Sequence, residues 1–314
     1  MTASPFLALP GAVPADGVDE GVPSHYGDPF REQRALLVGR GVVDLSHRGV
    51  IRVSGADRLG WLHSLTTQHL ESLPPDTWTT TLVLSPNGHV EHAMTGYDDG
   101  EAFWAHVEPG EAPSLVQWLD SMRFLMRVEA SDVSSDWAVL ATGPEAFELV
   151  CRPDLVDRMD VALAADVKPC GVWAFEALRI ARGEARFGLD TDHRTIPNEV
   201  GWLGTAVHMD KGCYRGQETV ARVYTLGRPP RRLVLLHLDG SVDRLPAHGS
   251  PVTLDGREVG FVGSSARHFE LGPIGLALVK RSTPVAVELL ADGVAASQEV
   301  LVDPEVGLHV RARL

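Results

Sequence analysis

One short segment of this sequence contains the residues best suited to reactive chemistry. It begins at residue 211 and reads Lys211-Gly212-Cys213-Tyr214-Arg215-Gly216-Gln217-Glu218-Thr219-Val220-Ala221-Arg222. Gly212 and Gly216 bracket the cysteine, and this spacing suits a tight loop in which the backbone approaches a ligand closely. The chemistry in view is that of a thiol, which acts as a nucleophile or a metal ligand once it is deprotonated.

The position of Cys213 predicts how its thiol is tuned. From Gln217 onward the residues favour a helix, so Cys213 is expected just ahead of a helix N-terminus, between Lys211 and Arg215. The helix dipole and both cations favour the thiolate, whereas Glu218 opposes it. A lone cysteine is also often a small buried hydrophobic residue. The residues alone leave both interpretations of Cys213 open.

The histidines do not form a metal-binding pattern. On a strand, His89 and Glu91 share one face while His92 points to the other, and three ligands without a fourth are too few for a structural zinc site. No metal site is predicted. Further histidines share no spacing and are interpreted as surface or capping groups, namely His25, His47, His63, His69, His106, His193 and His208. The tryptophans are interpreted as core residues, and Trp202 is the one candidate for stacking on a ligand.

Helices and strands alternate irregularly through the first two thirds of the chain. The β-branched run 79–84, the turn Pro86-Asn87-Gly88 and the run 90–97 predict a β-hairpin. Apolar residues at helical spacing predict helices over 31–38, 54–65, 113–122 and 173–182. Strands are expected at 42–45, 49–53, 102–107, 124–128 and 137–141, with a short helix at 144–150. This mixture predicts the α+β class.

The chain ends in a series of short apolar runs. The segment 226–232 contains two prolines and three arginines, which indicates a linker of limited flexibility. Six runs follow, at 233–238, 251–254, 259–264, 274–279, 285–290 and 300–302, with Asp-Gly turns at 255–256 and 292–293. Many short strands in so few residues predict a small β-barrel.

Composition excludes several classes of function. The formal net charge is −14, and nucleic-acid binding rests on Lys and Arg neutralising phosphates, so direct nucleic-acid binding is not expected. Three cysteines without CxxC spacing argue against a disulfide framework and against a zinc or cluster site within one chain. The sequence has no run of the ~20 apolar residues that a membrane span needs, and the first residues lack the basic region of a signal peptide. A cytoplasmic protein without a membrane partner is therefore predicted.

The cysteine segment resembles a known family signature. Lys211-Gly212-Cys213-Tyr214-x-Gly216-Gln217-Glu218, followed by Ala221-Arg222, resembles the signature of the YgfZ proteins, which are non-methyltransferase relatives of the glycine-cleavage aminomethyltransferase. The segments 41–46 and 49–55 resemble the opening of the GcvT-like folate-binding fold. Residues 178–183 and 196–199 resemble its centre, and the C-terminal strands resemble its barrel. The resemblance covers about residues 25–314.

The resemblance implies an architecture and a ligand. We expect a loosely ordered or disordered tail at 1–24, a folate-binding region of two lobes at 25–226 and a barrel domain at 227–314, with the three lobes around a channel that binds tetrahydrofolate or a derivative. Glu199 is the candidate for accepting the pterin's N–H groups, or else a helix-start acid. Arg222 pairs with Glu218 one turn earlier or faces a ligand carboxylate, and the structural pair is preferred. The remaining candidate cofactor-binding residues are Lys211, Gly212, Tyr214, Gly216, Gln217, Glu218 and Trp202.

Two departures from the transferases bear on the reaction. The acidic pair that supplies the transfer aspartate corresponds here to Glu91-His92, so that aspartate is missing. The helix that carries a pterin-contacting acid in the transferases has Ala181 at that place, so one folate contact is absent. Glycine-cleavage aminomethyl transfer is therefore not expected.

Three hypotheses for the function follow from this resemblance. The first is an accessory factor that binds a reduced folate and supports assembly or repair of iron–sulfur clusters in client enzymes, including tRNA-thiolating radical enzymes. Its partners are Fe–S client or assembly proteins, and its functional thiol is Cys213. The second is a folate-dependent one-carbon transferase with an altered substrate. The third is an interaction module that has lost the ligand.

Overall fold

The computed structural model describes residues 4–308 of the chain. The chain forms two compact units, each assembled from separate stretches. The first unit contains the residues up to Trp61, together with Ser72–Thr79 and Met94–Leu178. The second unit contains Leu62–Glu71, Thr80–Ala93 and the chain from Arg179 onward.

A five-stranded sheet has the strand order β5-β6-β7-β4-β8. Strand β4 pairs antiparallel with β7 on one side and with β8 on the other, and β6 pairs antiparallel with β7. Helix α3 packs against β8 and β4, so the apolar positions of its amphipathic face, such as Leu115 and Leu119, are buried. The elements are α2 (Arg58–Leu65), α3 (Ala112–Ser121), β4 (Gly49–Ser54), β5 (Thr79–Leu84), β6 (Val90–Asp98), β7 (Ala102–Val107) and β8 (Glu129–Asp132).

A four-stranded sheet in the first unit has the order β10-β9-β3-β11. Strands β3 and β11 run parallel, and the other pairs are antiparallel. Helix α1 packs on β11 and β3. The elements are α1 (Pro29–Leu37), α4 (Leu155–Ala164), α5 (Val172–Ala181), β3 (Gly41–Asp44), β9 (Trp137–Ala141), β10 (Phe147–Cys151) and β11 (Lys168–Cys170), with short 3-10 helices at Pro5–Ala8, Gly17–Asp19, Arg152–Asp154 and Pro197–Glu199 and a two-stranded sheet of β1 (Val13–Pro14) and β2 (Pro23–His25).

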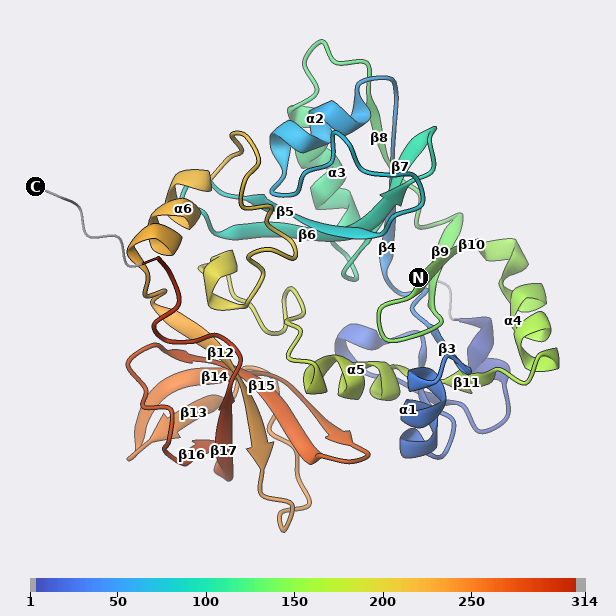
Figure 1. The fold of residues 1–314 in the computed structure, drawn as a ribbon. Helices are drawn as coiled ribbons and strands as arrows, with labels where there is room; N and C mark the ends of the chain where they lie inside the picture. The colour runs from blue at the N-terminus through green and yellow to red at the C-terminus, as the bar shows by residue number, and fades with distance from the viewer. Residues whose placement is uncertain (1–3, 309–314) are drawn as a thin grey trace, which may run out of the picture. The chain divides into compact units, whose positions relative to one another are not determined.

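Six antiparallel strands close into a barrel in the second unit, drawn in orange and red in Figure 1. Their order is β12-β15-β14-β13-β16-β17, and alternate residues such as Val234, Leu236 and Leu238 point into one apolar core. The predicted α+β class and the C-terminal barrel are confirmed. The elements are α6 (Gln217–Leu226), β12 (Arg231–Leu238), β13 (Pro251–Leu254), β14 (Arg257–His268), β15 (Gly272–Lys280), β16 (Leu289–Ala291) and β17 (Val294–Val300).

Residues 4–24 do not form the loosely ordered tail that their composition suggested. Phe6 is fully buried in a core cluster with Val42, Leu140 and Met159, and the Ser4 hydroxyl donates to the Asp44 carboxylate. Burial raises the pKa of that carboxyl above its ordinary value. The buried Phe6 side chain anchors the segment. The high content of Ala, Gly and Pro in the segment gives no sign of this anchor. Residues 1–3 of the predicted tail lie outside the described residues.

Two local predictions in the first unit were wrong. Residues 124–128 form a loop instead of a strand, exposed at 124–127 and buried at Val128. The backbone N–H of Arg127 donates to the Asp57 side chain and not to a neighbouring strand. The helix expected at 144–150 is replaced by β10, which pairs with β9 across a turn closed by Thr142 and Ala146. In both places a tertiary partner overrides the local preference.

Candidate functional site

The cysteine loop lies in the second unit, directly before α6. Cys213 is exposed and is not in a disulfide. Helix α6 begins at Gln217, as expected, and Gly216 precedes it in the left-handed conformation at φ 79°. The backbone N–H of Gln217 donates to the Tyr214 carbonyl at 3.2 Å. Of the two interpretations of Cys213, the buried hydrophobic one does not hold.

Lys211 caps the end of helix α2. Its side chain is 6% exposed, and its ammonium donates to the backbone carbonyls of His63, Thr66 and Gln68. These carbonyls belong to the last turn of α2 and the residues after it, where the helix dipole favours a cation. Burial lowers the pKa of Lys211 to about 8. The sequence suggested that this charge acts on the Cys213 thiol, but its hydrogen bonds go to the helix end.

The glycine and arginine that follow the cysteine hold the β5–β6 hairpin. A Cβ on Gly216 would lie 2.4 Å from the Ser85 carbonyl oxygen, and a Cβ on Gly88 would lie 2.8 Å from Thr219 Cβ. The Arg215 guanidinium donates to the Glu91 carboxylate at 2.9 Å. The close neighbour of Gly216 is therefore the β5–β6 hairpin, where the sequence suggested a ligand. A Cβ on Gly212, in contrast, would meet open space.

Tyr214 and Trp202 pack against a small apolar cluster of the second unit. The cluster contains Leu82, Val90 and Val220, and both aromatic side chains are partly buried against it. Burial raises the pKa of Tyr214 to about 12. The Tyr214 ring also lies 5.2 Å from the Lys211 ammonium, a distance at which a cation is attracted to the ring face. The packing of Trp202 accords with a core role.

Glu199 is the centre of a buried ion pair. It is 1% exposed and accepts from the Arg231 Nε at 2.9 Å and from a terminal nitrogen of Arg231 at 2.8 Å. The same carboxylate accepts from the Ile196 backbone N–H at the start of a 3-10 helix. Arg231 also donates to both oxygens of Asp192, at 2.7 and 3.0 Å. Glu199 is thus a helix-start acid whose acceptor positions are largely occupied.

The neighbour of Glu199 has a polar atom without a partner. Asn198 is 3% exposed, and its amide nitrogen donates to the Val220 carbonyl at 3.3 Å. Within residues 4–308, its buried side-chain oxygen accepts no hydrogen bond. A buried amide oxygen in this state can accept from an N–H donor of a ligand. In the sequence, Asn198 stood out only as part of a motif and had no predicted role.

Gln217, Glu218 and Arg222 lie on the first turns of α6. Glu218 and Arg222 are exposed, and Gln217 is half-buried. The structural ion pair preferred from sequence is not formed: no contact in the described part of the chain joins Glu218 to Arg222. Both charges therefore remain at the surface beside the cysteine loop.

Three histidines that seemed unrelated in sequence lie together in the second unit. The ring of His69 is 4.7 Å from that of His63 and 5.3 Å from that of His208. Burial, and secondly the Lys211 charge, lower the pKa of His63. The tertiary structure brings these rings together from two segments, so no spacing rule could find them. The described residues contain no group of three or more His, Cys, Asp or Glu arranged to hold a metal ion.

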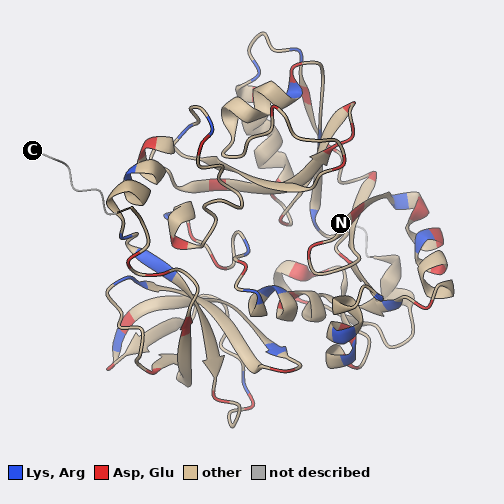
Figure 2. Cartoon of the chain, viewed as in Figure 1, with Lys and Arg blue, Asp and Glu red and all other residues tan. Residues whose placement is uncertain are grey.

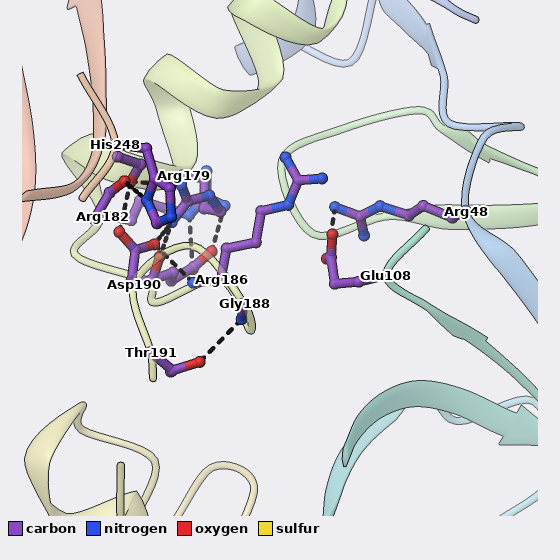
Figure 3. A network of polar contacts seen from close by, with 12 residues as sticks. Arg48, Glu108, Arg179, Arg182, Arg186, Gly188, Asp190, Thr191 and His248 are labelled. Atoms are coloured by element: carbon purple, nitrogen blue, oxygen red, sulfur yellow. Dashed lines mark hydrogen bonds and ion pairs between the residues drawn. The ribbon is translucent and has the colours of Figure 1, made fainter. Parts of the chain in front are cut away.

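A second buried network ties the end of α5 to the barrel (Figure 3). Arg179 donates to the Asp190 carboxylate at 2.8 Å and to the Ser264 hydroxyl at 2.8 Å, and Ser264 in turn donates to Asp190 at 2.7 Å. A Cβ on Gly263 would overlap Asp190. In the sequence, Arg179 was notable only as part of the segment 178–183, which resembles the centre of the family's fold. Its partners were not predicted, because Asp190 lies 11 residues away in an irregular segment and Ser264 lies 85 residues away.

The first unit has its own buried cation, also drawn in Figure 3. Arg48 lies 3.5 Å from Glu108 and 5.6 Å from the centre of the Phe175 ring. His106 is buried beside it, and burial, followed by the Arg48 charge, holds the pKa of His106 well below its ordinary value. The imidazole is therefore neutral near pH 7, and within the described residues its Nε2 has no hydrogen-bond partner.

Comparison with known proteins places this architecture in a family. Residues 22–163 match the model of the GCVT N-terminal domain, and residues 231–314 match the glycine cleavage T-protein C-terminal barrel domain. The aminomethyltransferase of Geobacillus kaustophilus (strain HTA426) is 30% identical over 90% of this chain and 88% of its own length. The chain belongs to the glycine cleavage T-protein family.

Other relatives of this T-protein family member support the same placement. A protein of Arabidopsis thaliana named as a chloroplastic transferase is 27% identical over 82% of this chain and 70% of its own length. The crystal structure of the glycine cleavage system aminomethyltransferase T from Bartonella henselae superimposes with a TM-score of 0.77 over 94% of each chain. At 18% identity this last match shows the common fold.

The cysteine loop of this T-protein family member falls outside both matched ranges. The first matched range ends at residue 163 and the second begins at residue 231. Cys213, Lys211 and Glu199 lie between the two ranges. Neither family model therefore covers the thiol, which needs its own argument. No helix among residues 4–308 is long and apolar enough to cross a membrane.

Proposed function

We propose that this chain is a YgfZ-type member of the T-protein family, which binds tetrahydrofolate or a derivative and supports the assembly or repair of iron–sulfur clusters. Its clients are Fe–S enzymes or their assembly proteins, including tRNA-thiolating radical enzymes, and the functional thiol is Cys213. The proposal includes the division of the chain at residues 25–226 and 227–314 into a folate-binding region and a barrel domain, and a cytoplasmic location.

The observation that carries this proposal is the contrast between Cys213 and its neighbours. Lys211 caps a helix, Arg215 and Gly216 hold the hairpin, and Tyr214 packs on the core. Each of these residues is accounted for by the architecture of the loop. The Cys213 thiol is exposed and contributes to none of these contacts. A cysteine at the centre of this segment is therefore best explained by a reaction or a ligand contact of its thiol.

The residues of the second unit fit a folate in part. Glu199, which the resemblance suggested as the acceptor for the pterin N–H groups, already pairs with Arg231. The unpartnered Asn198 oxygen is suited to accept a pterin N–H. Exposed Arg222 would pair with the ligand's carboxylate, with Gly212, Gln217 and Glu218 beside it. When bound, a reduced folate supplies one-carbon chemistry, and these residues bind and orient it.

The test uses a strain that lacks this protein. Wild type, Cys213→Ser and the control Cys151→Ser are reintroduced, and aconitase activity is measured beside glycine-cleavage flux. We expect wild type and Cys151→Ser to restore aconitase while Cys213→Ser does not, with glycine cleavage unchanged throughout. Full rescue by Cys213→Ser would remove the role proposed for the thiol. Lower glycine-cleavage flux with normal aconitase would overturn the accessory function.

A second candidate is a folate-dependent one-carbon transferase, because several relatives carry the name aminomethyltransferase. Turnover of an aminomethyl donor in the presence of tetrahydrofolate would favour this function over the accessory one. Calorimetric titration separates both from a ligand-free interaction module. Tetrahydrofolate binding at submillimolar concentration, weakened about tenfold by Asn198→Ala, is expected for the first two, and no heat of binding supports the third.

A further inference from the structure

The loop between α3 and β8 carries three apolar side chains in solvent. Phe124 is 87% exposed, Leu125 is 100% exposed and Met126 is 39% exposed. We call these three residues the apolar tip. They are consecutive, so the tip is one continuous patch and differs from the singly scattered apolar residues that any surface shows.

The base of this loop is firmly held. Arg127 makes three hydrogen bonds with the Asp57 carboxylate, at 2.6 to 3.0 Å, and the Trp61 indole donates to the Met122 carbonyl at 3.2 Å. A Cβ on Gly55 would lie 2.0 Å from the Arg127 carbonyl oxygen, so only glycine allows this approach. The tip is presented on a fixed support and is not an unanchored connection. In Figure 1 the loop projects past α2 at the top of the view.

The backbone of Phe124 gives an independent reason to expect function. Its φ is 43°, a left-handed conformation that is an outlier for a bulky side chain and that Gly or Asn adopts more easily. No burial of the ring offsets this strain, since the side chain lies in solvent. Strain that packing does not explain points to a role for the side chain itself.

An unpaired cation beside the tip indicates the chemistry of the occupant. Two arginines flank the tip, and Figure 2 shows these basic positions on both arms of the loop. The charge of Arg127 is paired with Asp57, so Arg123 is the one whose charge is available to a partner. Arg123 is exposed and forms no ion pair within the described residues. Phe, Met and Arg are also the side chains enriched at the centres of protein interfaces.

We propose that the apolar tip docks transiently onto a partner protein that offers an apolar pocket bordered by carboxylates. A permanent dimer of this chain is disfavoured by size, because an aromatic side chain buries about 150–250 Å² while a stable interface buries ~800 Å² per partner. A lipid surface is disfavoured because stable anchoring needs a second, usually polybasic, signal, which so acidic a chain lacks.

The test places a photo-crosslinking amino acid, p-benzoylphenylalanine, at position 125 of the full-length protein in living cells. We expect one protein adduct, weakened at least about 30-fold by Phe124→Ser and lost with Arg123→Glu, but kept with Arg123→Lys. The same probe at Val161, which is 62% exposed on α4, should not give this adduct. Neutralising the carboxylates around the cross-linked pocket of the identified partner should weaken the adduct as well.

Several outcomes would overturn the proposal. The first is an adduct whose yield changes neither with Phe124→Ser nor with Arg123→Glu, and the second is the absence of any protein adduct. The third is an adduct between two copies of this chain. The fourth is a lipid adduct together with co-sedimentation on phosphatidylcholine–phosphatidylglycerol vesicles. The unfolding midpoint of Phe124→Ser should equal that of wild type, because the ring lies in solvent, which separates lost docking from lost folding. The cross-link does not depend on the Fe–S proposal, so the two stand or fall separately.

Discussion

At the scale of single residues, the charges around the cysteine loop stabilise the structure more than they tune the thiol. Lys211 donates to carbonyls at the end of α2, Arg215 pairs with Glu91 of the hairpin, and Glu199 pairs with Arg231. The segment that resembles the YgfZ signature therefore consists mainly of framework residues. The exposed Cys213 thiol takes part in none of these contacts.

The ion-pair cluster of Arg231 gives a prediction at this scale. Arg231→Leu leaves Glu199 buried without its partner, and we expect the free energy of unfolding to fall by about 3–5 kcal/mol. Arg231→Lys, which keeps the charge but not the paired geometry, should lose less. Adding Glu199→Gln to Arg231→Leu should recover part of the loss. Urea denaturation measures all three variants, and a loss below ~1 kcal/mol for Arg231→Leu would contradict a structural role.

The same cluster predicts a pH dependence. Burial raises the pKa of Asp192, but the hydrogen bonds and charge of Arg231 outweigh it and hold the pKa below the ordinary 3.8. In acid the unfolded chain then binds more protons than the folded one, so this contribution to stability is complete above pH ~4 and is lost as the pH falls further. Denaturant titrations between about pH 5 and 3 should show this loss in wild type and a shallower one in Arg231→Leu.

At the scale of elements, the decisive feature is how the β5–β6 hairpin meets the cysteine loop. The hairpin was evident from its turn sequence, and α6 from its helix-forming residues, because both signals are local. Their contact through Gly216, Gly88 and Thr219 could not be read from the sequence, since it joins positions more than a hundred residues apart. The same holds for the loop at 124–128, where Asp57 decides the conformation.

Gly216 provides the prediction at the element scale. Gly216→Ala should destabilise the protein by about 2–3 kcal/mol, because its φ is positive and the new Cβ would overlap the Ser85 carbonyl. Gly212→Ala is the matched control in the same loop, where a Cβ meets nothing, and its effect should lie within about 0.5 kcal/mol. Thermal unfolding of both variants is the measurement, and equal effects would contradict the hairpin contact.

At the scale of the whole molecule, neither compact unit is a continuous stretch of chain. The boundary falls inside α2, β5, β6 and α5, so unfolding one unit removes parts of elements that belong to the other. We therefore predict a single cooperative transition, with the calorimetric enthalpy equal to the van't Hoff enthalpy. Two resolved heat-absorption peaks would show that the units unfold independently.

The α+β class, the barrel, the hairpin and the segment that contains the thiol could all be predicted before folding was considered, because they depend on short-range periodicity and turn chemistry. Three other facts became evident only in the folded molecule: which charges are already paired, that Phe6 anchors the N-terminal segment, and that His63, His69 and His208 are neighbours. These facts depend on burial and on partners from distant positions. The energy of a polar or apolar side chain is set by such partners, and no local pattern in the sequence records them.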